Sequence, residues 1–253
     1  MYNLTHFIPP GTVPIITISF IATIVRSTFG FGESLIAVPL FVLVVPLGVA
    51  VPLSVLMSLL VAMVVVVQDH KEIHVASAKW LILYALPGIP IGLLILKYGN
   101  EYVVKIGLGL LIMGYSIYAL NAKNSLHLKE DNRFWLFICG FMSGVLGGAY
   151  GLNGPPLVVY GNMRKWPAQH FRATLQAYFL PVSFMGLVGY LIQGLVGWTV
   201  IKYFLFCLPV AIPAIFLGRY FNQKLKGTSF FRYVYGGLIF IGAVLIFFTI
   251  RGI

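Results

Sequence analysis

The hydrophobic residues of this 253-residue chain fall into ten apolar segments, separated by short stretches that are polar or rich in glycine and proline. A helix needs about 20 apolar residues to cross the hydrocarbon core of a bilayer. Eight segments are long enough, whereas the second and seventh hold only about 12 residues between helix breakers and are expected to be short or broken. The segments lie at about Pro14–Phe29, Leu35–Pro46, Val49–Val67, Ala78–Leu96, Val103–Leu120, Phe134–Tyr150, Leu152–Met163, Ala168–Ile192, Trp198–Phe221 and Phe230–Ile250. The pattern predicts an all-α polytopic membrane protein.

The composition leaves little material outside the bilayer. Hydrophobic residues make up 60% of the chain and charged residues only 9%, against about 25% charged in a soluble domain. Ten crossings use about 200 residues, so no extramembrane domain is expected. The net charge of +11 comes from basic residues that punctuate apolar runs instead of forming a water-facing patch, so nucleic acid is not expected as a partner.

An internal repeat relates the two halves of the chain. Each half holds five segments, an odd number, so the second half must enter the membrane from the opposite side and the repeat is inverted. We expect a first repeat over residues 1–121, a cytoplasmic linker over 122–132 and a second repeat over 133–253. The matching positions are Ser27, Gly32 and Pro39 with Ser143, Gly148 and Pro155; Leu86, Pro87, Lys97, Tyr98 and Asn100 with Leu208, Pro209, Arg219, Tyr220 and Asn222; and Gly109, Leu110 and Gly114 with Gly237, Leu238 and Gly242.

The basic residues predict how the chain is oriented. With ten segments, 13 of the 17 lysines and arginines fall on one side of the membrane and four on the other. Because cytoplasmic loops carry the excess of positive charge, both termini are predicted outside the cytoplasm.

Helix breakers gather at matching places in the two halves. Gly30-Phe31-Gly32 precedes Pro39, and a run of glycines between residues 144 and 154 precedes Pro155-Pro156. A helix that ends and restarts inside a bilayer exposes amino-terminal amides to a cavity, where they can receive an anion. Close helix packing through small residues is the competing interpretation, since the spacing Gly140-x-x-x-Gly144 is itself a packing motif.

Two ionisable residues flank the first break. Arg26 follows the apolar run 15–25, and Glu33 lies directly after Gly32. A charge at membrane depth is costly and marks function. Arg26 could clamp an oxyanion, with Glu33 as its resting partner or a proton carrier; alternatively, both sit at a helix end and reach the cytoplasmic surface.

The second break is followed by a polar helix start. Arg172 and Gln176 are four residues apart and share a helix face, and Asn153 could lie across the break. A wet cytoplasmic helix start is the alternative. The candidate substrate-binding residues are Arg172, Gln176, Asn153, Gly154, Gly30, Gly32, Arg26 and Ser34, and the candidate proton-coupling residues are Glu33 and His170. No metal or cofactor is expected, because the segment 69–74 lacks the His-Glu-x-x-His pattern and Cys139 and Cys207 lie in apolar segments.

These motifs resemble the TauE/SafE sulfite exporter family over nearly the whole chain. The resemblance rests on Gly30-Phe31-Gly32 with Pro39-Leu40, on the run from Ser143 through Pro156, and on the run 171–175. It implies a secondary transporter of the bacterial-type inner membrane that exports sulfite or a sulfonate such as sulfoacetate. Within the resemblance, the family's glycine-rich region corresponds to Gly30, Gly32, Gly147, Gly148 and Gly154, and its Arg-Ala-Thr element to residues 172–174. Glu33-Ser34 departs from the family's small residues, which leaves the cargo open.

The expected mechanism is alternating access, in which one lobe rocks against the other around an anion held near the midplane. Proton coupling, oligomeric state and a non-sulfur anion such as a carboxylate remain open. An anion channel is the main alternative. An enzyme is not expected, because no catalytic serine setting and no paired acids for a metal-bound diphosphate are present.

Overall fold

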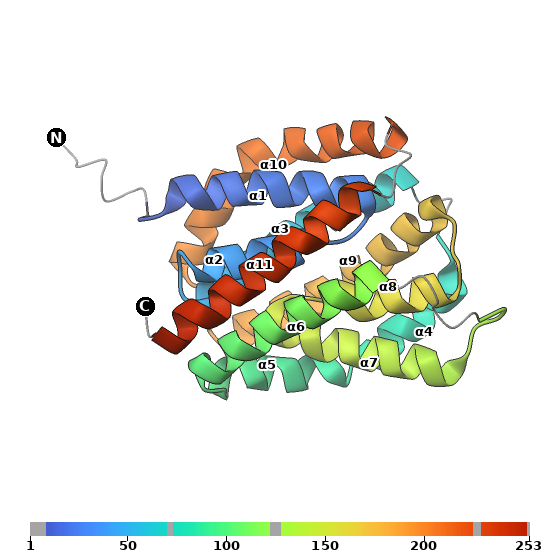
Figure 1. Cartoon of the computed structure of the whole chain (residues 1–253), viewed down its shortest axis with the longest axis horizontal. Coiled ribbons are helices and arrows are strands. Elements are labelled where there is room, and N and C mark those ends of the chain that lie inside the picture. The colour runs from blue at the N-terminus through green and yellow to red at the C-terminus, as the bar shows by residue number, and fades with distance from the viewer. Residues whose placement is uncertain (1–8, 70–72, 122–127, 225–228, 252–253) are drawn as a thin grey trace.

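The computed structural model describes residues 9–69, 73–121, 128–224 and 229–251, and these form eleven helices and no strand (Figure 1). The helices are α1 (Thr12–Phe29), α2 (Glu33–Val42), α3 (Leu47–Asp69), α4 (Val75–Ala85), α5 (Gly88–Tyr98), α6 (Glu101–Asn121), α7 (Arg133–Tyr150), α8 (Gly154–Met163), α9 (Ala168–Ile192), α10 (Trp198–Lys224) and α11 (Ser229–Arg251). Within the described residues, six helices are long and apolar enough to cross a membrane, or seven if α4 and α5 count as one bent span. The all-helical membrane prediction is confirmed. Residues 70–72 of the segment checked for metal ligands and residues 122–127 of the expected linker lie outside the described residues.

The second and seventh segments form short helices, as predicted. The helices α2 and α8 have 10 residues each, or about 15 Å at 1.5 Å per residue, which is half of a bilayer core. Each follows a helix that ends in a left-handed glycine, Gly30 with φ 84° and Gly151 with φ 68°. This backbone conformation suits glycine and stops α1 and α7 at the point where the short helices begin.

The fourth segment differs from the expected single helix. It is divided into α4 and α5, which are bent by 45° relative to one another. The break falls at Leu86-Pro87, where the proline removes a backbone donor and its ring opposes a continuous helix. Pro87 alone did not predict this break, because prolines also lie inside α10, which remains continuous.

The helices of the two halves interleave. In Figure 1, α1 lies along α10 on one side of the bundle, while α5 and α7 lie together on the opposite side. Between these units α3 packs against α9 and α6 against α11. When the halves are matched in chain order, α1 corresponds to α7, and α10 corresponds to α4 with α5. The contact of α1 with α10 is then the counterpart of the contact of α7 with α4 and α5. The α3–α9 and α6–α11 contacts each join a helix to its own counterpart. Each packing unit therefore mixes helices from both halves.

Glycines let α7 approach α4 and α5 at backbone contact. A Cβ atom at Gly144 would lie 2.9 Å from the carbonyl carbon of Ala85, and one at Gly92 would lie 2.7 Å from the amide nitrogen of Ala149. Gly148 meets the backbone of Ile89 in the same way. For Gly144 and Gly148, the packing interpretation is therefore the correct one.

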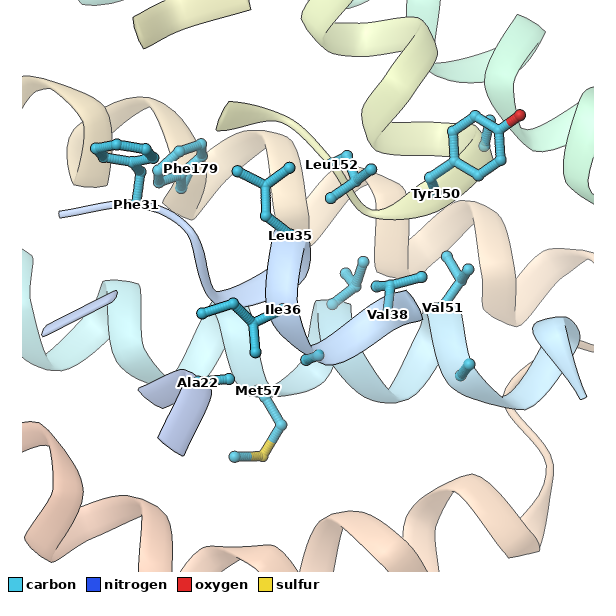
Figure 2. Packing of buried hydrophobic residues seen from close by; sticks show 14 of the residues in the cluster. Ala22, Phe31, Leu35, Ile36, Val38, Val51, Met57, Tyr150, Leu152 and Phe179 are labelled. Carbon is cyan, nitrogen blue, oxygen red and sulfur yellow. The ribbon is translucent and has the colours of Figure 1, made fainter. Parts of the chain in front are cut away.

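The apolar core encloses α2. Its side chains pack between α1 and α3, and Figure 2 shows Leu35, Ile36 and Val38 of α2 near Val51 of α3 and Leu152 of the segment between α7 and α8. These five residues are at most 9% exposed. The short helix is thus surrounded by protein, as non-spanning backbone at membrane depth must be.

Candidate functional site

A small cavity lies between the amino-terminal ends of α2 and α8, with walls from α1, α3 and α9. It has room for about one water molecule. Its lining is Arg26, Phe31, Gly32, Glu33, Ser34, Leu35, Ser58, Gly151, Leu152, Asn153, Gly154, Pro155 and Phe179. Six of the predicted site residues are among them: Arg26, Gly32, Glu33, Ser34, Asn153 and Gly154. The two breaks, which belong to different halves of the chain, thus meet at one place.

Arg26 and Glu33 form a buried ion pair in this cavity. Their side chains are 3% and 2% exposed, and Nη1 of Arg26 lies 2.7 Å from Oε2 of Glu33. Arg26 stands in the last turn of α1 and Glu33 in the first turn of α2, so the sharp turn between these helices brings them together. The burial of both side chains excludes the interpretation in which they reach the cytoplasmic surface, and it agrees with Glu33 as the resting partner of Arg26.

Three further groups hold the guanidinium of Arg26. Nη1 also donates to Oγ of Ser58, Nη2 donates to Oε1 of Gln176 over 3.0 Å, and Cζ lies 4.9 Å from the centre of the Phe179 ring. Buried charges require this kind of pairing and hydrogen bonding. Figure 2 shows the Phe179 ring beside Phe31 at this wall of the cavity. The guanidinium is therefore fixed independently of Glu33.

Gln176 connects Arg26 to the first break. Its Nε2 donates to the carbonyl oxygen of Gly30 over 2.7 Å, while its Oε1 accepts from Arg26. Gln176 is fully buried behind the cavity lining. At the other wall, Oγ of Ser34 accepts from Ser54 over 3.1 Å.

The ends of the two short helices are not equivalent donors. Neither Gly32 before α2 nor Asn153 before α8 makes a side-chain cap, so the first backbone amides lack a capping partner. The start of α8 contains Pro155 and Pro156, which have no N–H to offer. Both helix starts carry a partial positive charge, but the start of α2 offers more backbone N–H donors to the cavity than the start of α8.

Arg172 and His170 lie outside the cavity lining. Arg172 is 5% exposed and packs against Gly30, and its Nη1 donates to Oδ1 of Asn222 in α10 over 3.1 Å. Asn222 in turn donates to the carbonyl oxygen of Thr28 over 2.5 Å. Arg172 thus joins α9 to α10 beside the first break. His170 is exposed at the start of α9.

The sequence interpretation did not include Ser58, Phe31, Phe179 and Leu152, which also line the cavity. Ser58 could have been found, since Ser54 and Ser58 are four residues apart on one face of α3, which is otherwise apolar up to Val67. The three apolar residues carried no signal, because buried aromatic and aliphatic side chains are common in any membrane helix bundle.

Comparison with known proteins gives the same family as the motifs. The sequence profile described as sulfite exporter TauE/SafE matches residues 15–246. A probable sulfite/organosulfonate exporter TauE of Cupriavidus necator is 28% identical over 165 residues, which are 63% of each chain, so the match spans less than two thirds of that relative. A probable membrane transporter protein of Methanocaldococcus jannaschii is 25% identical over 232 residues, covering 84% of this chain and 86% of the relative.

No solved structure matches the chain. The profile match covers nearly all of the sequence, including α2 to α10 and most of α1 and α11. It also includes both short helices and the residues that line the cavity. This chain belongs to the TauE/SafE sulfite exporter family of membrane transporters.

Proposed function

We propose that this protein is a secondary transporter of the bacterial-type inner membrane that exports a small sulfur-containing anion, sulfite or a sulfonate such as sulfoacetate. The observation that carries the proposal is the buried guanidinium of Arg26, which faces a cavity between two uncapped helix starts. Guanidinium and helix-end amides are the groups that bind oxyanions. The name of the Cupriavidus relative, a probable sulfite/organosulfonate exporter, supports sulfur oxyanions as the cargo.

We further propose that the halves are inverted repeats and that the cavity lies at their shared axis. Contacts between helices that correspond in chain order support this, since α3 packs against α9 and α6 against α11. A Cβ at Gly109 of α6 would lie 3.0 Å from the carbonyl oxygen of Gly242 in α11. In α3 and α9, Oγ of Ser58 lies 3.4 Å from Oγ of Ser183. Such mutual contacts are expected where equivalent helices cross a two-fold axis.

The helix lengths suggest a different alignment of the repeats from the one read in the sequence. The helices α1 and α7 each have 18 residues, α2 and α8 each have 10, and Gly30 and Gly151 occupy the same left-handed position. Matching these glycines equates Gly32 with Asn153 instead of with Gly148, and Glu33 with Gly154. In this alignment both members of several equivalent pairs line the cavity, which supports a binding site between the repeats, as in other inverted-repeat transporters.

The small volume of the cavity favours a carrier over a channel. With room for about one water molecule, it cannot admit a sulfonate until the surrounding helices move. We propose that the unit of α1 and α10 moves against the unit of α7 with α4 and α5, and that the anion takes the place of Glu33 on Arg26. Arg172, which links α9 to α10, then has a positioning role in this movement.

The site is also proposed to couple anion movement to protons through Glu33. Among the described residues lining the cavity, Arg26 is the only cation and Glu33 the only acid, so an added anion leaves one buried negative charge uncompensated. A proton on Glu33 restores neutrality, which avoids the free-energy cost of an unpaired buried charge. Glu33 is placed for this role, whereas His170 is exposed outside the cavity.

Anion binding should therefore take up close to one proton per anion. The measurement is the pH change of a weakly buffered detergent solution when sulfite or sulfoacetate is added to the purified protein. In Glu33→Gln the amide still leaves Arg26 accessible, so binding should persist without proton uptake. Glu101→Gln, which removes the acid of an exposed pair with Lys105, should behave like the wild type; absence of uptake in the wild type would contradict the coupling.

The cargo is tested by thermal unfolding of the purified protein with sulfite, sulfate, sulfoacetate, taurine and carboxylate analogues. A ligand that binds only the folded state stabilises it by about 2.7 kcal/mol at a concentration 100 times its Kd, which corresponds to a rise in Tm of about 5 °C or more. Sulfite or sulfoacetate should give this rise. Stabilisation by carboxylates alone would indicate a different cargo, and no stabilisation by any anion would contradict the proposed site.

The proposed orientation places both termini outside the cytoplasm. Figure 1 shows the start of α1 and the end of α11 at the same end of the bundle, as an even number of crossings requires. The excess of basic residues in the loops at the other end supports a cytoplasmic location for that end.

A further inference from the structure

The geometry points to Gly147 as a positioning residue of the anion site: because it has no side chain, the amide of Asn153 can lie against α7 and turn its nitrogen toward the cavity. This inference rests on the proposed anion binding at Arg26 and names a second group that touches the cargo. Gly147 itself does not line the cavity, and its effect would pass through Asn153.

Gly147 is a seat for the side-chain oxygen of Asn153. A Cβ atom at residue 147 would overlap Oδ1 of Asn153, and it would lie 2.8 Å from Cγ and 3.4 Å from Nδ2 of the same amide. The oxygen therefore occupies the volume that any side chain at 147 would fill, while the nitrogen lies at the far edge of the amide. Since Asn153 lines the cavity with Arg26, this edge is the one that faces a bound anion.

The backbone of Asn153 is held in place, so the side chain cannot easily move elsewhere. Oγ of Ser143 in α7 donates to the carbonyl oxygen of Asn153 over 2.6 Å. The hydroxyl of Tyr178 in α9 donates to the same Oγ over 2.9 Å. With the backbone fixed by two helices, the seat at Gly147 determines where the amide points.

The amide of Asn153 is not used for internal structure. The residue is 5% exposed, and its Oδ1 has no hydrogen-bond partner within the part of the chain that the structure describes. An unpaired polar atom at this depth costs free energy, and Asn153 does not serve as a helix cap for α8. Since no capping or internal hydrogen bond of the side chain among the described residues accounts for the amide, its nitrogen is available to donate to a bound anion.

Asn153 and Arg26 approach the cavity from different halves of the chain. Arg26 comes from the end of α1, and Asn153 from the start of α8. In the proposed alignment of the repeats, Gly147 is the counterpart of Arg26. Where the first half has the long cationic side chain of Arg26, the second half has a glycine, and the neutral amide of Asn153 occupies the space beside it. An oxyanion would accept hydrogen bonds from the guanidinium on one side and from the Asn153 amide on the other.

The test is a double-mutant cycle on the Kd of sulfite or sulfoacetate, measured by calorimetry on the purified full chain. Gly147→Ala and Asn153→Ala should each weaken binding about tenfold, as expected for one hydrogen bond to a charged group. In the double variant, Gly147→Ala should add no further loss, because the amide that it displaces is already gone. A second full tenfold loss in the double variant would overturn the inference, since Gly147 would then act through helix packing.

Two further variants keep the result interpretable. If Gly147→Ala does not fold, Asn153→Ser takes its place in the test. It removes the amide without adding a Cβ atom at residue 147, and it should weaken anion binding by the same factor of about ten. Gly148→Ala, which clashes with α5 instead, should lower Tm without sharing the coupling to Asn153. If the wild type binds the anion and Arg26→Ala abolishes binding while Asn153→Ala leaves Kd unchanged, this inference fails and the proposed function stands; if the wild type binds no anion, the proposed function itself fails.

Discussion

Replacing Arg26 by alanine is expected to abolish anion-dependent stabilisation and to destabilise the protein by about 3–5 kcal/mol. The first effect follows from the loss of the only cation among the described lining residues. The second follows because Glu33, 2% exposed, would be left as an unpaired buried charge. Thermal unfolding with and without sulfite measures both effects in one experiment.

A paired replacement separates stability from binding. Arg26→Met combined with Glu33→Leu removes both charges, and swaps of this kind are often neutral or stabilising, so the double variant should fold while failing to bind or transport the anion. Arg172→Ala is the matched control, since it removes another buried arginine that contacts Asn222 outside the cavity; it should lower Tm and retain binding. Anion-dependent stabilisation of the double variant would show that Arg26 does not bind the cargo.

Gly144→Ala is expected to cost at least about 3 kcal/mol of stability, at the upper end of the range for overpacked sites. The added Cβ would lie 2.9 Å from the carbonyl carbon of Ala85 and 3.0 Å from its Cα. These are backbone atoms of α4, which cannot rotate away as a side chain can, so the two helices would have to separate. The fraction of protein that elutes as a single species after heating, compared with the wild type, measures the loss.

Two other glycines provide the control for this prediction. A Cβ at Gly114 of α6 or at Gly186 of α9 would meet nothing within 4 Å. Alanine at either position should be neutral or should stabilise by about 0.5–1 kcal/mol, because alanine is the better helix former. Equal losses at Gly144 and Gly114 would mean that glycine content, and not helix contact, governs stability.

The sequence predicted the helices well because their boundaries depend on local chemistry. The end of α1 at Gly30 and the end of α7 at Gly151 follow from glycine, and the short α2 and α8 follow from breakers close together. The break at Pro87 was not predicted, because Pro209 and Pro213 lie inside the unbroken α10. Whether a proline divides a membrane helix depends on the neighbours that satisfy the freed carbonyl groups.

The site was predicted less completely, because helix periodicity shows which residues share a face but not what that face meets. Arg172 and Gln176 are one turn apart, yet Gln176 reaches Arg26 while Arg172 reaches Asn222. The charged residues at the break were recognisable by their cost at membrane depth. Ser58 could be recognised by its spacing from Ser54, but its contact with Arg26 could not be predicted. Phe179 could be identified only once the packing was known.

The pairing of α1 with α10 has a consequence for biosynthesis. The ribosome completes α1 long before it reaches α10, which begins at Trp198. During most of translation, α1 is therefore in the bilayer without the helix against which it packs. Neither half synthesised alone can complete its own packing, whereas the two halves produced as separate polypeptides in one cell should find each other and assemble.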